Sequence, residues 1–196
     1  MHSPLAESAL EQLFTEARTQ YDWEPDPLPE TLIRQLYELV KFGPTAANSC
    51  PARFIFCTST DARAKLASVS SGNNEGKIRL APLTVIIGMD MEFHEKLPEL
   101  FPHADARSWF AGKEAAIRES AFRNSSLQGA YLIMAARSLG LDAGPMSGFD
   151  KAGVDAAFWA GTKVETNFIC SIGRGTGQKL FPRLPRLSFE DACRIA

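Results

Sequence analysis

The spacing of apolar residues predicts two helices in the first quarter of the chain. Apolar side chains recur at helical intervals over residues 10–17, and Ser3 and Pro4 before them are typical of a helix cap and first turn, so we expect a first helix that begins there. A second amphipathic pattern covers residues 29–42, and the Gly-Pro pair that follows is a usual helix end.

The longest helical pattern runs from about residue 113 to residue 139 and is apolar on most sides. A helix of this kind belongs inside a core or an interface. Arg123, Asn124 and Gln128 lie in its middle, and buried polar groups need hydrogen-bond partners. We therefore expect this helix to pack against something on nearly every side.

Apolar runs over residues 53–58, 83–89 and 166–172 predict strands, and the second of these runs has no polar alternation, which indicates a strand buried on both faces. The remaining segments are read as short helices near 61–69 and 151–159, a Gly- and Pro-rich loop over 141–150, and a closing helix capped by Ser188. Helices outnumber strands and do not alternate strictly with them, so the prediction is an α+β fold in one domain, residues 1–196.

Composition and charge exclude several classes of function. Lys and Arg number 21 against 23 Asp and Glu, a net charge of −2, which gives no case for a nucleic-acid partner. The apolar run at 83–89 is far shorter than the ~20 residues that a membrane span needs. Glu7 and Glu11 lie where a signal peptide would be apolar. We expect a cytoplasmic protein with no membrane partner.

Cysteines and histidines are few and scattered. The four cysteines form no CxxC pair, and with three histidines no zinc-like spacing can be drawn, so no metal site is expected. Cys57 and Cys170 lie in apolar runs and are expected to be buried and inert. The chemistry is therefore expected to come from a bound organic cofactor or from carboxylates.

The motif Gly173–Gly177 (GRGTG) follows a predicted strand and superficially suggests a dinucleotide site. Such a site needs a helix that opens directly after the glycines, and Pro182 and Pro185 argue against one here. We interpret the motif as a turn between a strand and the tail.

Three other groups of residues could approach a ligand. Small and hydroxyl residues fill 43–53 (GPTAANSCPAR), and a second glycine loop covers 144–149 (GPMSGF), although most segments of this kind are ordinary connections. Arg18, Arg183 and Arg186 could bind a phosphate or could simply be solvated.

Taken in order along the chain, these pieces resemble the nitroreductase family of FMN-dependent oxidoreductases. The resemblance covers nearly the whole chain and rests on Arg18-Thr19, Pro44–Asn48, Gly72–Asn74 with Lys77, the long helix, Gly140–Ala143, Pro145–Phe149, and Gly173 before a basic tail. It implies a mostly antiparallel sheet flanked by helices, an intertwined homodimer, and FMN bound at the subunit interface. It also implies NADH or NADPH as electron donor, with the chemistry carried by flavin N5 and no catalytic side chain.

The resemblance also implies roles for single residues. Those expected to contact FMN are Arg18, Arg183 and Arg186 at the phosphate, Thr45, Ala46 and Asn48 from the partner subunit, Asn74 and Lys77 at the pyrimidine edge, Asn124 toward the flavin, and Pro145, Met146, Ser147 and Gly148 along the ring. This chain departs from the family pattern at Asp22, where several members carry a basic residue.

Three segments, 101–110, 121–126 and 184–189, are similar to the branch of the family that includes malonic semialdehyde reductase of pyrimidine degradation. That similarity suggests malonic semialdehyde, reduced to 3-hydroxypropionate, as the acceptor. Arg107 could bind the substrate carboxylate, or it could form an ion pair with Asp105 or Glu114. The alternatives are a nitro or quinone reductase of broad specificity, another flavin reaction such as fragmentation or dehalogenation, and an FMN-binding redox module without enzyme activity.

Overall fold

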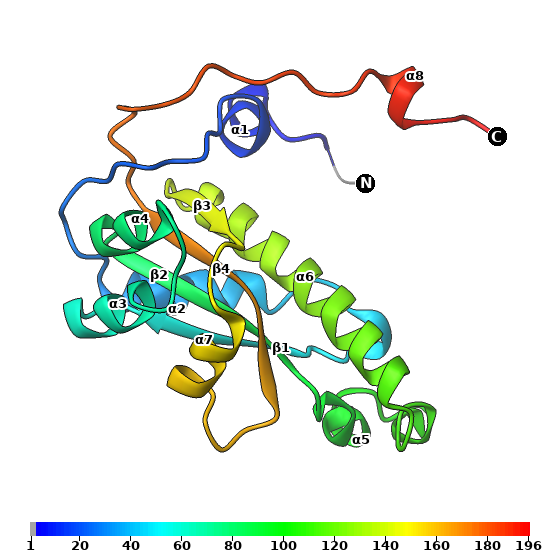
Figure 1. Cartoon of the computed structure of the whole chain (residues 1–196). Coiled ribbons are helices and arrows are strands. Elements are labelled where there is room, and N and C mark those ends of the chain that lie inside the picture. The colour runs from blue at the N-terminus through cyan, green and yellow to red at the C-terminus, as the bar shows by residue number, and fades with distance from the viewer. Residues whose placement is uncertain (1–2) are drawn as a thin grey trace.

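The apolar run expected to be buried on both faces is strand β2 (Leu83–Asp90), which lies inside the sheet. The computed structural model describes residues 3–196. The strand order is β1-β2-β4-β3, and each neighbouring pair is antiparallel (Figure 1). The other strands are β1 (Ala52–Cys57), β3 (Asp142–Met146) and β4 (Val164–Gly173). The predicted α+β class with a mostly antiparallel sheet is confirmed.

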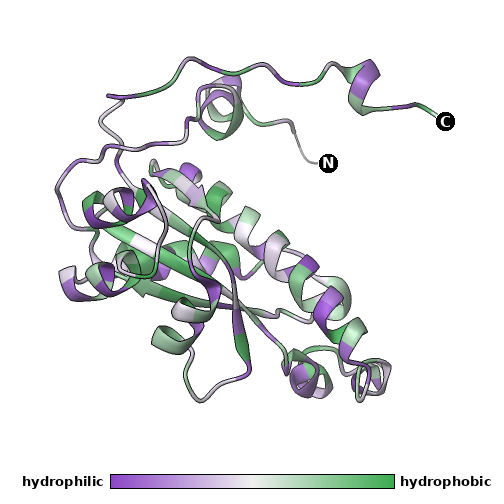
Figure 2. Cartoon of the chain, viewed as in Figure 1, coloured by the Kyte–Doolittle hydropathy of each residue, from purple (hydrophilic) through white to green (hydrophobic). Residues whose placement is uncertain are grey.

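Side chains alternate across β2, so each face of the sheet receives its own layer of helices. Val85 and Ile87 pack in one core cluster with residues of α2 (Glu30–Val40) and α6 (Glu114–Ser138). Ile86 packs in a second cluster with residues of helices on the opposite face. Those helices are α3 (Thr60–Ala67), α4 (Asn74–Leu80) and α7 (Lys151–Phe158). Much of the ribbon of the central strands is hydrophobic in Figure 2, as burial on both faces requires.

A third core cluster joins the segment after β2 to the N-terminal half of α6. Met89, Phe93 and Leu97 pack there with Ala106 and Ile117. The short elements of this segment are η3 (Phe93–Lys96), α5 (Leu97–Leu100) and η4 (Ala106–Trp109). Another short turn, η2 (Ala46–Asn48), precedes β1.

The two ends of the described chain run beside each other, away from the sheet (Figure 1). At the N-terminal end, α1 (Glu7–Leu10) continues into a wider helical turn, η1 (Glu11–Thr15). The tail after β4 is extended as far as α8 (Phe189–Ala192), where the Ser188 side chain accepts a hydrogen bond from the Asp191 N–H, as predicted. No helix opens after Gly173–Gly177, which agrees with the interpretation of that motif as a turn.

Two expectations about elements were wrong, and one helix was not predicted. The first helix begins at Glu7 and not at Ser3, because residues 3–6 are exposed and have nothing to pack against. Part of the predicted loop 141–150 is the edge strand β3, where Pro145 is tolerated because an edge strand has ladder bonds on one side only. Helix α4 was not expected, since Ile78 is its only buried residue and gives no periodic pattern.

Within residues 3–196, no helix is both long enough and apolar enough to cross a membrane.

Candidate functional site

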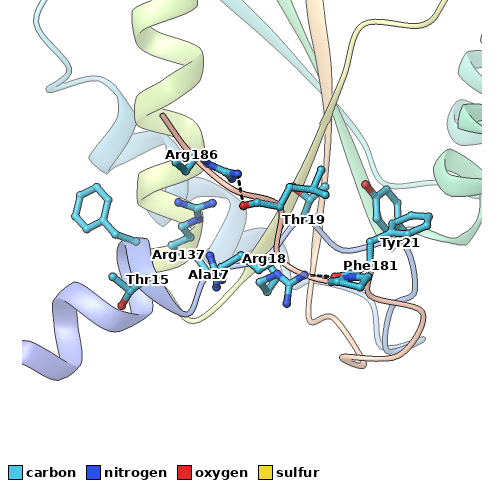
Figure 3. Close-up of a pocket in the computed structure, with 12 residues that line it drawn as sticks. Thr15, Ala17, Arg18, Thr19, Tyr21, Arg137, Phe181 and Arg186 are labelled. Atoms are coloured by element: carbon cyan, nitrogen blue, oxygen red, sulfur yellow. Dashed lines mark hydrogen bonds between the residues drawn. The ribbon is translucent and has the colours of Figure 1, made fainter. Parts of the chain in front are cut away.

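A cavity of about 670 Å³ lies between the segment after η1, the end of α6 and the tail (Figure 3). We call it the arginine cavity, because Arg18, Arg137, Arg183 and Arg186 all line it. Its other lining residues are Phe14, Thr15, Ala17, Thr19, Tyr21, Phe181, Pro182 and Leu184. The structure thus brings together the three arginines that the sequence singled out.

Arg18 and Arg186 are held by backbone carbonyls and not by carboxylates. Arg18 donates a hydrogen bond to the Phe181 carbonyl, and Arg186 Nη1 donates to the Leu184 carbonyl at 3.0 Å (Figure 3). Among the ion pairs of residues 3–196, none includes an arginine of this cavity. The positive charge is therefore available to an anion, and guanidinium groups suit phosphate in particular.

Sequence reasoning missed Arg137. It lies in the last turn of α6, and its Nη1 donates to the Leu13 carbonyl at 2.7 Å while its own carbonyl accepts from Gln12 Nε2 at 2.6 Å. These bonds tie the N-terminal segment to the end of α6. A basic residue in the last turn of a helix is common for electrostatic reasons alone, so the sequence carried no distinctive signal.

A second cavity, of about 190 Å³, adjoins the first, since Thr19 and Tyr21 line both. We call it the glycine cavity, after Gly144 and Gly148 in its wall. It contains Asn74, Lys77, Pro145, Met146, Ser147 and Gly148 together, all predicted, and also Gln20 and Ser171. The bridge between Thr19 and Ala143 holds the N-terminal segment against β3, which places the two cavities next to each other.

A polar chain lines one side of the glycine cavity. Lys77 Nζ lies 3.2 Å from Asn74 Oδ1 and 4.6 Å from the centre of the Tyr21 ring, and Asn74 Nδ2 donates to the Gly148 carbonyl at 3.0 Å. A Cβ atom at position 148 would lie only 2.7 Å from Asn74 Nδ2. The absence of a side chain there is what allows helix α4 and this loop to meet at the cavity.

Thr45, Ala46, Asn48 and Asn124 were predicted to contact the same cofactor, but they line neither cavity. They lie together elsewhere: the Ala46 N–H donates to Asn124 Oδ1 at 2.8 Å, and the Cys50 N–H donates to Thr45 Oγ1 at 3.1 Å. Asn48 Nδ2 donates to the Leu100 carbonyl at 2.9 Å.

The backbone of this loop is unusual. Ala47, Asn48 and Cys50 all have positive φ angles, of 51°, 49° and 40°. Such conformations cost about 1–2 kcal/mol for residues other than glycine and are found where a loop is held for a function.

Arg107 has a different partner from those expected. Its Nε and Nη2 bind the two oxygens of Glu95 at 2.7 and 2.8 Å. Arg107 therefore forms a structural ion pair, as one of the two alternatives held, but with Glu95 and not with Asp105 or Glu114. The hydrogen bond with Arg107 lowers the pKa of Glu95, and the same bond raises the pKa of Arg107. Arg107 lines a separate cavity of about 310 Å³ beside Pro102 and Asp105.

Asp22, which departs from the family pattern, is paired with the tail. Its carboxylate accepts from Lys179 Nζ at 2.7 Å and from Thr176 Oγ1 at 2.9 Å, and the first of these bonds is the main cause of its lowered pKa. The acid thus holds the start of the tail beside the N-terminal segment.

Two thiols are buried, as predicted. Burial raises the pKa of Cys57 to about 11 and that of Cys170 to about 12, which keeps both protonated near neutral pH. Within residues 3–196, no three His, Cys, Asp or Glu side chains are grouped as a metal site would require.

Comparisons with known proteins agree on one family. The sequence model of the Nitroreductase family matches residues 15–174. A protein of Stenotrophomonas maltophilia, provisionally named NADH dehydrogenase/NAD(P)H nitroreductase, is 59% identical over the full length of both chains. A provisionally named nitroreductase of Bacillus subtilis superposes with a TM-score of 0.89 at 20% identity, covering 97% of this chain and 100% of its own. A similar protein of Exiguobacterium sibiricum, solved in complex with FMN, gives 0.87 at 19% identity and full coverage of both chains. The chain therefore belongs to the nitroreductase family.

Proposed function

We propose that this protein is an FMN-dependent oxidoreductase that passes hydride from NADH or NADPH to a small acceptor. The observation that carries the proposal is the junction of the arginine cavity with the glycine cavity through Thr19 and Tyr21. The arginine cavity supplies positively charged guanidinium groups at one end of the combined space, and the glycine cavity supplies backbone and side-chain amide groups at the other. This polarity matches a ligand that has a phosphate at one end and a planar heterocycle at the other.

The phosphate end fits the charge that the arginines leave free. A phosphate monoester carries about −1.5 to −2 charges at pH 7. Arg18, Arg183 and Arg186 would bind it, and Arg137 would add to the local positive potential from the end of α6. Within residues 3–196 none of these side chains takes part in an ion pair, so phosphate binding would break none there.

The ring end fits a flavin edge. Asn74 and Lys77 would meet the pyrimidine edge, while Pro145, Met146, Ser147 and Gly148 would lie along the ring, with the Gly148 amide near N5. When bound, FMN supplies hydride acceptance and donation at N5, and the protein supplies position and electrostatics. Lys77, which carries a positive charge beside this edge, would favour negative charge on the ring after reduction.

We further propose a homodimer in which each subunit contributes to both flavin sites. Asn124 and Arg137 are separated along α6 by about 20 Å at the helical rise per residue. The loop bound to Asn124 would therefore serve the partner's FMN through Thr45, Ala46 and Asn48. Exposed apolar side chains on α6 and in the tail support burial against a second copy: Phe122, Leu127, Tyr131, Leu184, Leu187 and Phe189.

For the acceptor we propose malonic semialdehyde, on the resemblance of segment 101–110 to that branch of the family. Nitro compounds are the second candidate, favoured by the name carried by the relative that is 59% identical. Arg107 would need to exchange Glu95 for a substrate carboxylate, or bind it alongside that partner. Since both electron donors are cytoplasmic metabolites, we also propose a cytoplasmic location.

The test is anaerobic reduction of the purified protein loaded with FMN. We expect flavin absorbance that bleaches on addition of NADH or NADPH and returns on addition of malonic semialdehyde or of a nitroaromatic compound. Light scattering on the same sample should give the mass of a dimer. A protein that stays colourless after incubation with FMN would contradict the proposal, and bound flavin that neither donor reduces would favour a binding module.

A further inference from the structure

Several lining residues of the arginine cavity belong to the tail: Phe181, Pro182, Arg183, Leu184 and Arg186 (Figure 3). Residues 181–196 are all exposed, and within residues 3–196 no hydrogen bond joins 182–196 to the rest of the chain. The place of the two tail arginines therefore depends on what holds the chain just before them.

Asp22 holds that stretch of the tail at two points. Its carboxylate oxygens accept from Lys179 Nζ at 2.7 Å and from Thr176 Oγ1 at 2.9 Å. The Thr176 N–H also donates to the Asp22 carbonyl at 3.2 Å. We call Asp22, Thr176 and Lys179 the latch, because one acid joins the N-terminal segment to two positions of the tail.

The backbone within the latch has an unfavourable conformation. Gly177 and Lys179 have positive φ angles, of 71° and 57°. A left-handed conformation is disfavoured for lysine and persists only where the surrounding contacts impose it. The ion pair with Asp22 is such a contact, because the Lys179 side chain is otherwise 68% exposed. Loss of this ion pair would therefore let the turn relax and the tail move.

The remaining contacts of this stretch with residues 18–21 involve side chains of the candidate site itself. Arg18 donates to the Phe181 carbonyl, and the Tyr21 ring lies 5.7 Å from the Phe181 ring, edge to face. Arg18 would have to share its guanidinium group with a bound phosphate. The latch residues line neither cavity, so the latch can hold the tail both with and without a ligand.

We propose that Asp22 is a positioning residue, which binds Lys179 and Thr176 and so holds Arg183 and Arg186 where they can reach the phosphate of FMN. This inference rests on the proposed FMN function and extends it to a residue that lines neither cavity. It also gives a role to the departure from the family pattern at position 22, because a basic side chain there could not form an ion pair with Lys179.

The direction of the effect distinguishes this role from simple electrostatics. An acid near a phosphate site repels the ligand, so on charge alone its removal should tighten FMN binding. Loss of the latch should weaken FMN binding, because the tail arginines are no longer held at the cavity. We expect Asp22→Ala to weaken FMN binding by a factor of about 3 to 10 and to leave the binding of riboflavin, which has no phosphate, unchanged.

Flavin fluorescence titration of the full chain measures both dissociation constants. Glu24→Ala is the matched control, since Glu24 is exposed and its backbone N–H keeps its hydrogen bond to the Arg174 carbonyl at 2.8 Å. This variant removes the same charge from the same segment but no part of the latch. Its affinity for FMN should equal or slightly exceed that of the wild type.

Variants of Lys179 test the same contact from the side of the tail. Lys179→Arg keeps a cation and should bind FMN as the wild type does, whereas Lys179→Met should bind it more weakly. Lys179→Met combined with Asp22→Ala should lose no more affinity than Asp22→Ala alone, because both substitutions break one contact. If Asp22→Ala does not fold, the comparison of Lys179→Met with Lys179→Arg carries the same test.

Trypsin cleavage of the flavin-free protein measures the latch without a ligand. Cleavage after Arg183 or Arg186, identified by mass spectrometry, should be about 3 to 10 times faster in Asp22→Ala than in the wild type, because a released tail is more often open to the protease. Glu24→Ala should be cleaved at the rate of the wild type.

The inference is overturned if Asp22→Ala binds FMN as tightly as the wild type or more tightly, or if FMN and riboflavin lose affinity equally. Equal rates of tail cleavage in Asp22→Ala and in the wild type would also overturn it. Failure of the wild type to bind FMN contradicts the proposed function instead, and the cleavage rates then still decide whether Asp22 holds the tail.

Discussion

Asn124, in the middle of the longest helix, accepts a hydrogen bond from the Ala46 N–H at 2.8 Å, across 78 positions of sequence. Its Nδ2 meanwhile donates to the Ser120 carbonyl at 2.9 Å, so both halves of the amide are paired inside the protein. The bond fixes the start of a loop in which Ala47, Asn48 and Cys50 have left-handed backbone conformations. The buried asparagine thus provides an anchor for a strained loop.

Replacement of Asn124 by leucine should therefore destabilise the protein by about 1 kcal/mol, because the partly buried hydrogen bond that anchors the loop at Ala46 would be lost. Urea unfolding followed by circular dichroism gives the free energy of unfolding. Asn73→Ala is the matched control, since Asn73 is exposed and should change stability by less than about 0.5 kcal/mol. Equal stabilities of the Asn124 variant and the wild type would show that the loop is held by other contacts.

Two helical glycines should respond to alanine with opposite signs. In α6, a Cβ atom at Gly129 would lie 2.3 Å from the Phe168 ring of β4, so Gly129→Ala should cost about 1–3 kcal/mol through overpacking. In α4, nothing lies within 4 Å of a Cβ atom at Gly76, so Gly76→Ala should stabilise by about 0.5–1 kcal/mol through helix propensity.

The free energy of unfolding in urea, measured for both variants, distinguishes the cost of overpacking at Gly129 from the gain in helix propensity at Gly76. A stabilised Gly129→Ala variant would mean that α6 and the sheet are less closely packed than the structure shows.

The helices and strands differ in how well the sequence predicts them. Strand β2 was predicted because a long apolar run arises directly from burial on two faces. Helix α6 was predicted because its helical pattern is long and uninterrupted, although its apolar side chains Phe122, Leu127 and Tyr131 are exposed in the single chain. Strand β3 was not predicted, because Gly144 and Pro145 disfavour strands and only its pairing with β4 makes it one. That pairing is a tertiary effect without a local signal.

Most residues of the candidate site could be predicted from the sequence, but their individual contacts could not. Arginines and glycine-rich loops could be chosen from residue type and family resemblance, and the structure gathers many of them around adjoining cavities. The partners of single side chains could not be predicted: Glu95 lies 12 positions from Arg107, a separation that fits no regular helix or strand contact. Gln20 and Arg137 have ordinary local sequences, and only the folded chain shows what surrounds them.

Glu165 should make stability depend on pH in the acidic range. Its carboxylate accepts from Arg118 at 2.9 and 2.6 Å and from Lys151 at 2.9 Å, and the Arg118 bond is the main reason that its pKa falls to about 2. A carboxylate with a lowered pKa stabilises the fold above its unfolded pKa, near 4.5, and this contribution is lost as the pH falls from there toward 2.

Glu165→Gln should therefore cost about 1–2 kcal/mol at pH 7, a figure reduced for solvent screening because the side chain is 27% exposed. The difference between the variant and the wild type should shrink below pH 4.5. Denaturant unfolding at pH 7, 4 and 3 measures it. Glu119→Gln is the control, because its pair with Arg123 is an exposed pair within one helix and should contribute little. A difference that stays constant down to pH 3 would indicate that the charge of Glu165 is not what stabilises the fold.

Arg186 provides the most direct test of where the phosphate binds. The guanidinium lines the arginine cavity and is held by the Leu184 and Pro185 carbonyls at 3.0 and 3.2 Å, without a carboxylate partner among the described ion pairs. If it binds the FMN phosphate, Arg186→Met should weaken FMN binding by a factor of about 10 to 100, the usual worth of a charge-assisted hydrogen bond. The same variant should bind riboflavin, which has no phosphate, as the wild type does. Flavin fluorescence titration measures both constants, and Arg194→Met, in the exposed tail, serves as the control for a simple loss of positive charge. Equal losses for FMN and riboflavin would mean that Arg186 supports the cavity wall and does not recognise the phosphate.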